Sequence, residues 1–264
     1  MNLCDSHCHL DAAEFDHDRA GVLARARAAG IACQLIPAVD RAGWPKIAAL
    51  VAREPGLHAA YGLHPLFLAQ HTDADLDALP DFIANTKTLA LGECGLDFFL
   101  PQLDRDRQLA VLRPQLQLAR ALDLPVILHA RRALDPLLAE VRRVGGLRGI
   151  VHSFSGSLEQ ARQWCRAGFL LGFGGPVTYP RARRLRAVVS ELPLAHLVLE
   201  TDSPDQPLYG HQGERNEPAR LPQVLAAVAE LRQDEPENIA TATSQNLHRL
   251  LGLGDGHQLA GNTP

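Results

Sequence analysis

The feature that most constrains the fold is a regular alternation of short apolar segments with longer amphipathic ones. Eight segments rich in β-favouring residues recur along the chain, at residues 2–9, 31–39, 57–63, 88–96, 125–130, 148–154, 168–175 and 195–202. Amphipathic stretches such as 18–30 and 105–123 separate them and have the pattern of helices. Strands that alternate with helices form parallel βα units. Eight such units in about 250 residues predict a (β/α)8 TIM barrel, an α/β fold.

One barrel accounts for nearly all of the 264 residues. Barrels of this length are commonly single domains, and the sequence contains neither an internal repeat nor a visible linker. We therefore expect one barrel domain at residues 1–253. The small and polar residues 254–264 are expected to form a flexible tail.

Charge and hydropathy limit the partners that such a chain can have. It carries 26 Lys and Arg against 30 Asp and Glu, a net charge of -4, which argues against a broad basic face for long nucleic acid. No apolar run approaches the ~20 residues of a membrane span, so no membrane partner is expected. No obligate protein partner is evident. The N-terminus enters the first strand without room for a signal peptide, which predicts a cytoplasmic protein.

The cysteines indicate neither a disulfide framework nor a zinc ribbon, because they are odd in number and lack a CxxC spacing. They are Cys4, Cys8, Cys33, Cys94 and Cys165. We expect most of them to be small core residues.

Side chains that can bind metal recur at the carboxyl ends of the predicted strands, which meet at one mouth of a barrel. In chain order they are His7, His9, Glu93, His129, His152 and Asp202. The first two alternate along a strand and would lie on the same face. One buried histidine is more often hydrogen-bonded than ligating, but four imidazoles and two carboxylates together predict a metal site. Imidazoles favour zinc, manganese or iron over magnesium, which stays a candidate.

The segments that contain these residues resemble the TatD-related metal-dependent hydrolases of the amidohydrolase-like barrels. They are DSHCHLD (5–11), GLHP (62–65), LGECGLDFF (91–99), LPVILHAR (124–131), VHSFSGS (151–157), ETDSPD (200–205) and RNEP (215–218). The resemblance implies a phosphodiester-cleaving deoxyribonuclease with two divalent metal ions per subunit. It places one metal ion on His7, His9, Glu93 and Asp202, and the other on Glu93, His129 and His152.

Physical arguments support these roles. Two cations about 4 Å apart can bind both sides of an in-line displacement, and a bridging carboxylate holds them together. Related barrels use a carboxylated lysine as the bridge, but neither Lys46 nor Lys87 ends a strand here. Asp202 is the candidate to hold the attacking water and accept its proton. Asp5 could accept a histidine ring N–H, and a plain buried hydrogen bond explains it equally well.

Four further residues are candidates for contacts with the substrate. His64 follows the third strand and could contact the scissile phosphate or the leaving group, a catalytic role. Arg131, two residues beyond His129, offers a guanidinium to a phosphate. Arg215 and Asn216 belong to a long loop after the eighth strand, where a substrate clamp would lie, although loop polarity alone would explain them equally well.

Three functions fit this set of residues. The leading prediction is a metal-dependent deoxyribonuclease that trims DNA at short or single-stranded ends. The alternative is a small-molecule hydrolase that cleaves an amide, lactone or phosphoester in the same mouth, because one barrel supports many chemistries. The third is a metal-binding barrel without turnover.

Overall fold

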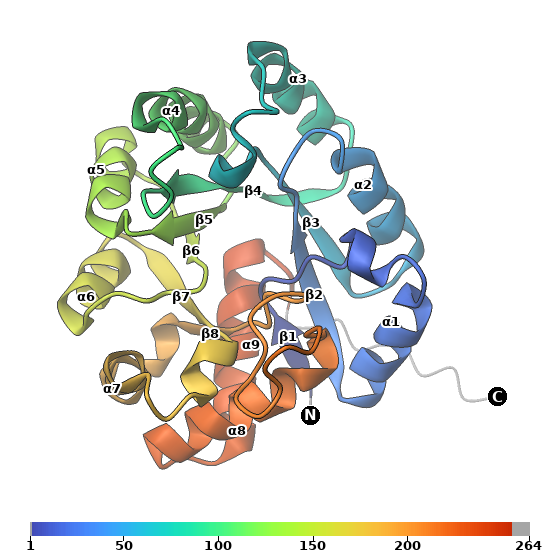
Figure 1. Ribbon diagram of the computed structural model, residues 1–264, viewed down its shortest axis with the longest axis vertical. Coiled ribbons are helices and arrows are strands. Elements are labelled where there is room, and N and C mark those ends of the chain that lie inside the picture. The colour runs from blue at the N-terminus through green and yellow to red at the C-terminus, as the bar shows by residue number, and fades with distance from the viewer. Residues whose placement is uncertain (1, 255–264) are drawn as a thin grey trace.

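Eight parallel strands form one sheet in a computed structural model that describes residues 2–254 (Figure 1). The strands neighbour one another in chain order. They are β1 (Leu3–Asp5), β2 (Ile31–Pro37), β3 (Leu57–Tyr61), β4 (Thr88–Asp97), β5 (Val126–Arg131), β6 (Gly149–Val151), β7 (Phe169–Phe173) and β8 (Leu197–Leu199). Backbone hydrogen bonds join the last strand to the first, from Ser6 N to Leu199 O and from Asp202 N to His7 O, each 2.9 Å. The predicted TIM barrel is therefore confirmed.

The helices surround the strands, as Figure 1 shows. They are α1 (Arg19–Ala28), α2 (Trp44–Arg53), α3 (Asp73–Ala84), α4 (Arg105–Ala121), α5 (Leu134–Val144), α6 (Leu158–Arg166), α7 (Arg183–Glu191), α8 (Leu221–Arg232) and α9 (Pro236–Leu251). Local sequence explains how α6 begins: Ser157 and Gln160 form a capping box, and Trp164 one turn later is buried against the sheet. None of the helices in the described part of the chain is long and apolar enough to cross a membrane.

Six of the eight strands end earlier than the sequence predicts, and in three of them the difference places site residues beyond the strand. Strand β1 ends at Asp5, so His7 and His9 follow the strand rather than belonging to it. Strands β6 and β8 end before His152 and Asp202. Asp202 has a positive φ of 53°, a conformation that cannot continue a strand. The functional side chains therefore lie on the segments that leave the strands.

Two apolar clusters hold the barrel together, one between the sheet and the helices and one inside the barrel. The inner cluster takes small or branched side chains from successive strands, among them Leu35, Ala60 and Ile150. Leu247 and Leu251 of α9 pack against it. Because these α9 residues meet the strands near their amino ends, α9 closes that end and the opposite mouth stays open. Residues 255–264, most of the predicted tail, lie outside the described residues.

Candidate metal centre

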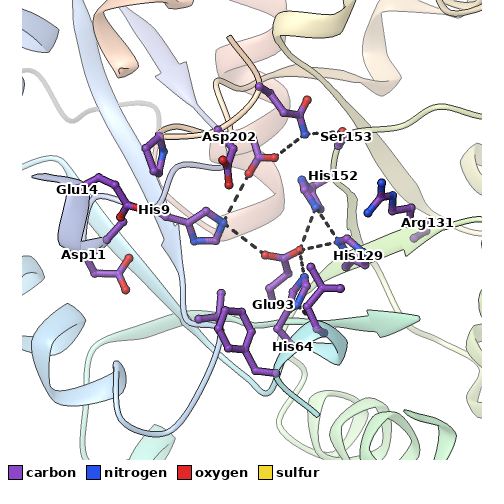
Figure 2. Close-up of a pocket in the computed structure, with 18 of the residues that line it drawn as sticks. His9, Asp11, Glu14, His64, Glu93, His129, Arg131, His152, Ser153 and Asp202 are labelled. Atoms are coloured by element: carbon purple, nitrogen blue, oxygen red, sulfur yellow. Dashed lines mark hydrogen bonds and ion pairs between the residues drawn. The ribbon is translucent and has the colours of Figure 1, made fainter. Parts of the chain in front are cut away.

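A pocket of about 670 Å³ opens at the carboxyl ends of the strands (Figure 2). It is lined by five of the six predicted metal ligands, namely His9, Glu93, His129, His152 and Asp202. The sixth, His7, is fully buried, with its Nε2 3.1 Å from Glu93 Oε2. The structure thus brings all six residues to one place, although they come from five different strand ends.

Glu93 lies at the centre of the site, and its two carboxylate oxygens face different sets of histidines. Oε2 lies 3.1 Å from His7 Nε2 and 3.7 Å from His9 Nε2. Oε1 lies 3.3 Å from His129 Nδ1 and 2.9 Å from His152 Nε2. A carboxylate in this position has the geometry that a bridge between two cations requires.

Asp202 completes the first of these sets. Its Oδ1 lies 3.6 Å from His7 Nε2 and 3.5 Å from His9 Nε2. Its Oδ2 accepts a hydrogen bond from the side-chain amide of Gln206, which also donates to Ser153 Oγ at 2.9 Å. The positive φ of Asp202 turns this carboxylate into the pocket, and such backbone strain is common where function requires it.

The polar atoms of the site fit divalent cations. Glu93 Oε1 is buried and makes no hydrogen bond, although three ring nitrogens lie within 3.3 Å of it. Ring nitrogens also face each other, 3.2 Å apart in the pair His7–His9 and 3.4 Å apart in the pair His129–His152. A buried carboxylate oxygen without a hydrogen bond is costly, and a cation among these donors would remove that cost. Imidazole and carboxylate donors together suit zinc, manganese or iron.

The electrostatics keep both carboxylates ionised, as ligands must be. Burial disfavours the charged form of Glu93, but the surrounding histidines, first His64 and His152, outweigh burial and hold its pKa well below the usual range. Burial likewise opposes ionisation of Asp202. The hydrogen bond with His9 and the charges of His152 and His7 lower the pKa of Asp202 to about 2.

His64 is placed as a hydrogen-bond donor. Its Nδ1 accepts the amide hydrogen of Leu66 at 3.1 Å, so the ring proton of the neutral form resides on Nε2. That Nε2 lies 3.0 Å from Glu93 Oε1 at the wall of the pocket. Burial lowers the pKa of His64 to about 4, which keeps the ring neutral. Its contact with a substrate oxygen stays a prediction.

Asp97 contacts a predicted metal ligand, a role that the sequence analysis did not assign to it. Its Oδ2 lies 3.1 Å from His129 Nε2, and its Oδ1 accepts the amide hydrogen of Phe99 at 2.9 Å. Donation from Nε2 to Asp97 leaves Nδ1 of His129 unprotonated toward Glu93, which is how carboxylates orient metal-binding histidines. Its place at the end of β4, an even number of residues beyond Glu93, is the signal that could have identified it.

Glu200 was missed by the sequence analysis. It is fully buried beneath the site, where its carboxylate accepts the amide hydrogen of Ser153 and the hydroxyl hydrogen of Ser6. Gly172 leaves the space for it, because a Cβ at that position would lie 2.0 Å from Glu200 Oε2. Only the pairing of β7 with β8 makes this requirement visible.

The rim of the pocket is largely acidic. Figure 2 shows Asp11 and Glu14 on one side and Arg131 on the other, and Asp205 also lines the pocket. Arg131 is the one arginine or lysine among the lining residues in the described part of the chain. Its guanidinium lies 3.6 Å from the centre of the Phe99 ring. The structure therefore brings Arg131 to the site, as predicted.

Arg215 and Asn216 do not line the pocket, so the structure does not support the predicted clamp. The Arg215 guanidinium forms two bonds with Asp18, at 2.9 and 2.7 Å, which occupy the donors that a phosphate would need. Asn216 is fully buried and donates to the backbone oxygens of Thr201 and Gln206. Both residues hold the loop after β8 in place.

Asp5 accepts the backbone amide hydrogens of His7 and Thr201 rather than a ring N–H.

Comparison with known protein families shows to which family the chain belongs. The family model described as TatD related DNase matches residues 4–252. The chain belongs to this family. Its TatD-family relatives include YjjV of Escherichia coli, named an uncharacterized metal-dependent hydrolase. The two are 42% identical over 252 residues, which cover 94% of this chain and 97% of YjjV.

The solved structure of YjjV and one further relative extend the comparison. The crystal structure of YjjV superimposes on this TatD-family chain with a TM-score of 0.92 and 40% identity, covering 96% of this chain and 98% of that one. A protein of Cronobacter sakazakii named 3'-5' ssDNA/RNA exonuclease TatD is 32% identical over 264 residues, covering 94% of this chain and 97% of the relative. The resemblance seen in the sequence motifs is confirmed, and the chain is a metal-dependent hydrolase by family.

Proposed function

We propose that this protein is a metal-dependent deoxyribonuclease that removes nucleotides from single-stranded DNA ends. The observation that carries the proposal is the buried Glu93 carboxylate, whose two oxygens face separate sets of histidines with Asp202 beside one of them. The nuclease named among the relatives supports phosphodiesters as the substrate class.

The chain would hold two divalent cations, one on His7, His9, Glu93 and Asp202 and the other on Glu93, His129 and His152. Bound there, the cations would supply Lewis-acid activation of water and of the phosphoryl oxygens. The protein contributes the placement of the donors. Asp97 orients the ring of His129, and the buried surroundings strengthen each electrostatic contact.

Asp202 and His64 have distinct roles in the proposed reaction. The Asp202 side chain is 12% exposed and ionised, so it can accept a hydrogen bond from the attacking water and take its proton as the new O–P bond forms. His64, neutral with its proton on Nε2, donates to a phosphate or leaving-group oxygen.

The size and charge of the pocket favour a chain end as the substrate. A volume of about 670 Å³ is that of a small-ligand site and admits a terminal nucleotide rather than a duplex. Arg131 provides one guanidinium for a phosphate, and the 39% exposed ring of Phe99 beside it can stack on a base.

The test is an assay of the metal-reconstituted protein on labelled single-stranded and duplex oligonucleotides, beside a panel of esters, lactones and amides. We expect cleavage from single-stranded ends, and a loss of at least ~100-fold in Asp202→Asn with an unchanged circular dichroism spectrum. Asp77→Asn, exposed on α3 and not among the residues that line the pocket, is the matched control and should retain activity.

The same assay distinguishes the alternatives. Turnover of esters or lactones with intact oligonucleotides would favour the small-molecule hydrolase, a reading to which the acidic rim of Asp11, Glu14 and Asp205 lends support. Binding of metal without turnover of any substrate would leave only the metal-binding barrel.

A further inference from the structure

A second cluster of metal-binding side chains lies at the amino-terminal end of the barrel, away from the pocket. Cys4 of β1 and Cys33 of β2 are direct partners in the register of these neighbouring strands. His248, in the last turn of α9, lies beside them, with its Nε2 3.2 Å from Cys4 Sγ. None of the three residues lines the carboxyl-end pocket.

The geometry of this cluster is that of a metal site. Its two sulfur atoms and one ring nitrogen all lie within 4.8 Å of one another. In a tetrahedral zinc site, Zn–S bonds of about 2.3 Å and Zn–N bonds of about 2.0 Å place sulfur and nitrogen roughly 3.5 Å apart. The donors are therefore already close to the separation that a cation would impose on them.

The surroundings show why these residues are more than core packing. Cys4 and Cys33 are 5% and 4% exposed, in an inner cluster otherwise formed by aliphatic side chains. His248 is partly exposed and lines a surface pocket of about 560 Å³ together with Gln245 and Arg249. Two buried thiols and an imidazole thus meet where solvent can supply a cation and a water as fourth ligand.

We propose that Cys4, Cys33 and His248 form a binding site for a soft or borderline cation, zinc before others, at the closed end of the barrel. Thiolate and imidazole ligands select such cations over magnesium or calcium. The cation would displace the two thiol protons and join α9 to β1 and β2, which lie far from α9 in sequence. The site is independent of the proposed catalytic metals, since the two ends of the barrel share no ligand.

Cobalt(II) titration of the full-length protein tests the proposal, because a thiolate-to-cobalt charge-transfer band reports sulfur ligands alone. No cysteine of the described residues lines the carboxyl-end pocket, so cobalt bound there contributes nothing to this band. We expect the band to saturate with one equivalent bound at the new site and to bleach when zinc is added. It should persist in Glu93→Gln, in which the catalytic site is impaired.

Substitutions assign the band to this cluster. Cys33→Ser should abolish it, His248→Gln should weaken cobalt affinity and alter the band, and Cys165→Ser in α6 is the matched control that should retain it. If Cys33→Ser does not fold, His248→Gln at the partly exposed position decides the question. A missing band in the wild type, or a band that is unchanged in His248→Gln, would overturn the proposal.

A disulfide between Cys4 and Cys33 is the competing outcome. Thiol titration of denatured protein purified without reductant measures it directly. Five reactive thiols, the full number in the sequence, are expected for the metal site after removal of the cation. A loss of two thiols that reductant restores, and that Cys33→Ser prevents, would replace the metal site with a disulfide.

Discussion

At the residue scale, the site depends most on Glu93. It is 1% exposed, and its carboxylate contacts histidines that follow or end β1, β3, β5 and β6. No other carboxylate among the described residues makes contacts of this kind with so many strand ends. Substitution of Glu93 is therefore the most direct test of whether this residue bridges two cations.

Glu93→Gln should lose coupled occupancy of the two metal positions. An amide has one carbonyl oxygen, and its NH₂ group would face one of the histidine sets without charge compensation. Metal content after dialysis, with calorimetric titration, measures the change. Glu54→Gln, at a partly exposed ion-pair partner of Arg27, is the control and should bind metal as the wild type does. Two full equivalents bound to Glu93→Gln at wild-type affinity would remove Glu93 from the bridging role.

At the element scale, closure of the barrel between β8 and β1 depends on a buried carboxyl group. Asp5 Oδ1 accepts the amide hydrogen of Thr201 at 3.0 Å, and Oδ2 accepts its hydroxyl hydrogen at 2.6 Å. Burial raises the pKa of Asp5 from 3.8 to about 8, in spite of these hydrogen bonds. The folded protein thus holds a proton here at neutral pH, which couples closure to pH.

Asp5→Asn should become more stable relative to the wild type as pH rises. The unfolded chain releases the Asp5 proton above pH 3.8, whereas the folded chain releases it only near pH 8. Protonated Asp5 therefore stabilises the folded wild type fully below pH 3.8, and this stabilisation is lost as the pH rises from 3.8 to about 8. Within this pH range, the free energy of unfolding of Asp5→Asn relative to that of the wild type should rise by about 1.4 kcal/mol per pH unit. Urea denaturation of chelator-treated protein measures it, with the exposed Asp77→Asn as control. A difference that stays constant between about pH 4 and pH 8 would contradict a protonated Asp5.

At the scale of the whole molecule, charge limits how nucleic acid can be held. The net charge is -4, and the pocket rim carries Asp11, Glu14 and Asp205 against Arg131. Few phosphates can be neutralised at once by such a surface, so most of the attraction must come from the metal-loaded pocket itself. Binding should therefore depend only weakly on salt.

Metal-loaded Asp202→Asn should bind a short single strand with a slope of log affinity against log salt of roughly -1 to -3, since each neutralised phosphate contributes about -0.7. Arg131→Ala in the same background should make the slope shallower by about 0.7, and Arg53→Ala on the distant helix α2 should not change it. Fluorescence anisotropy across a salt series at fixed free metal measures the slope. A slope steeper than about -5 would indicate a long basic track, and no binding at low salt would contradict a nucleic-acid substrate.

The barrel and the six candidate metal ligands at its mouth could be predicted from the sequence. Apolar periodicity is a local property, so all eight strands are recognisable without knowledge of their neighbours. Parallel topology then requires that residues at the carboxyl ends of strands meet, which is why Glu93, His129 and His152 could be grouped in advance. The exact strand ends were harder to predict, because a residue such as Asp202 leaves the strand through its backbone angle and not its side-chain type.

Which polar residues pair with one another could not be predicted from the sequence. Arg215 is a plausible phosphate ligand until the loop after β8 meets Asp18, which binds both terminal nitrogens of its guanidinium. Cys4, Cys33 and His248 have no motif spacing and are joined because β1 pairs with β2 while α9 returns beneath them. Such pairings depend on closure of the whole barrel, which brings together residues more than 200 positions apart, and no local pattern encodes that distance.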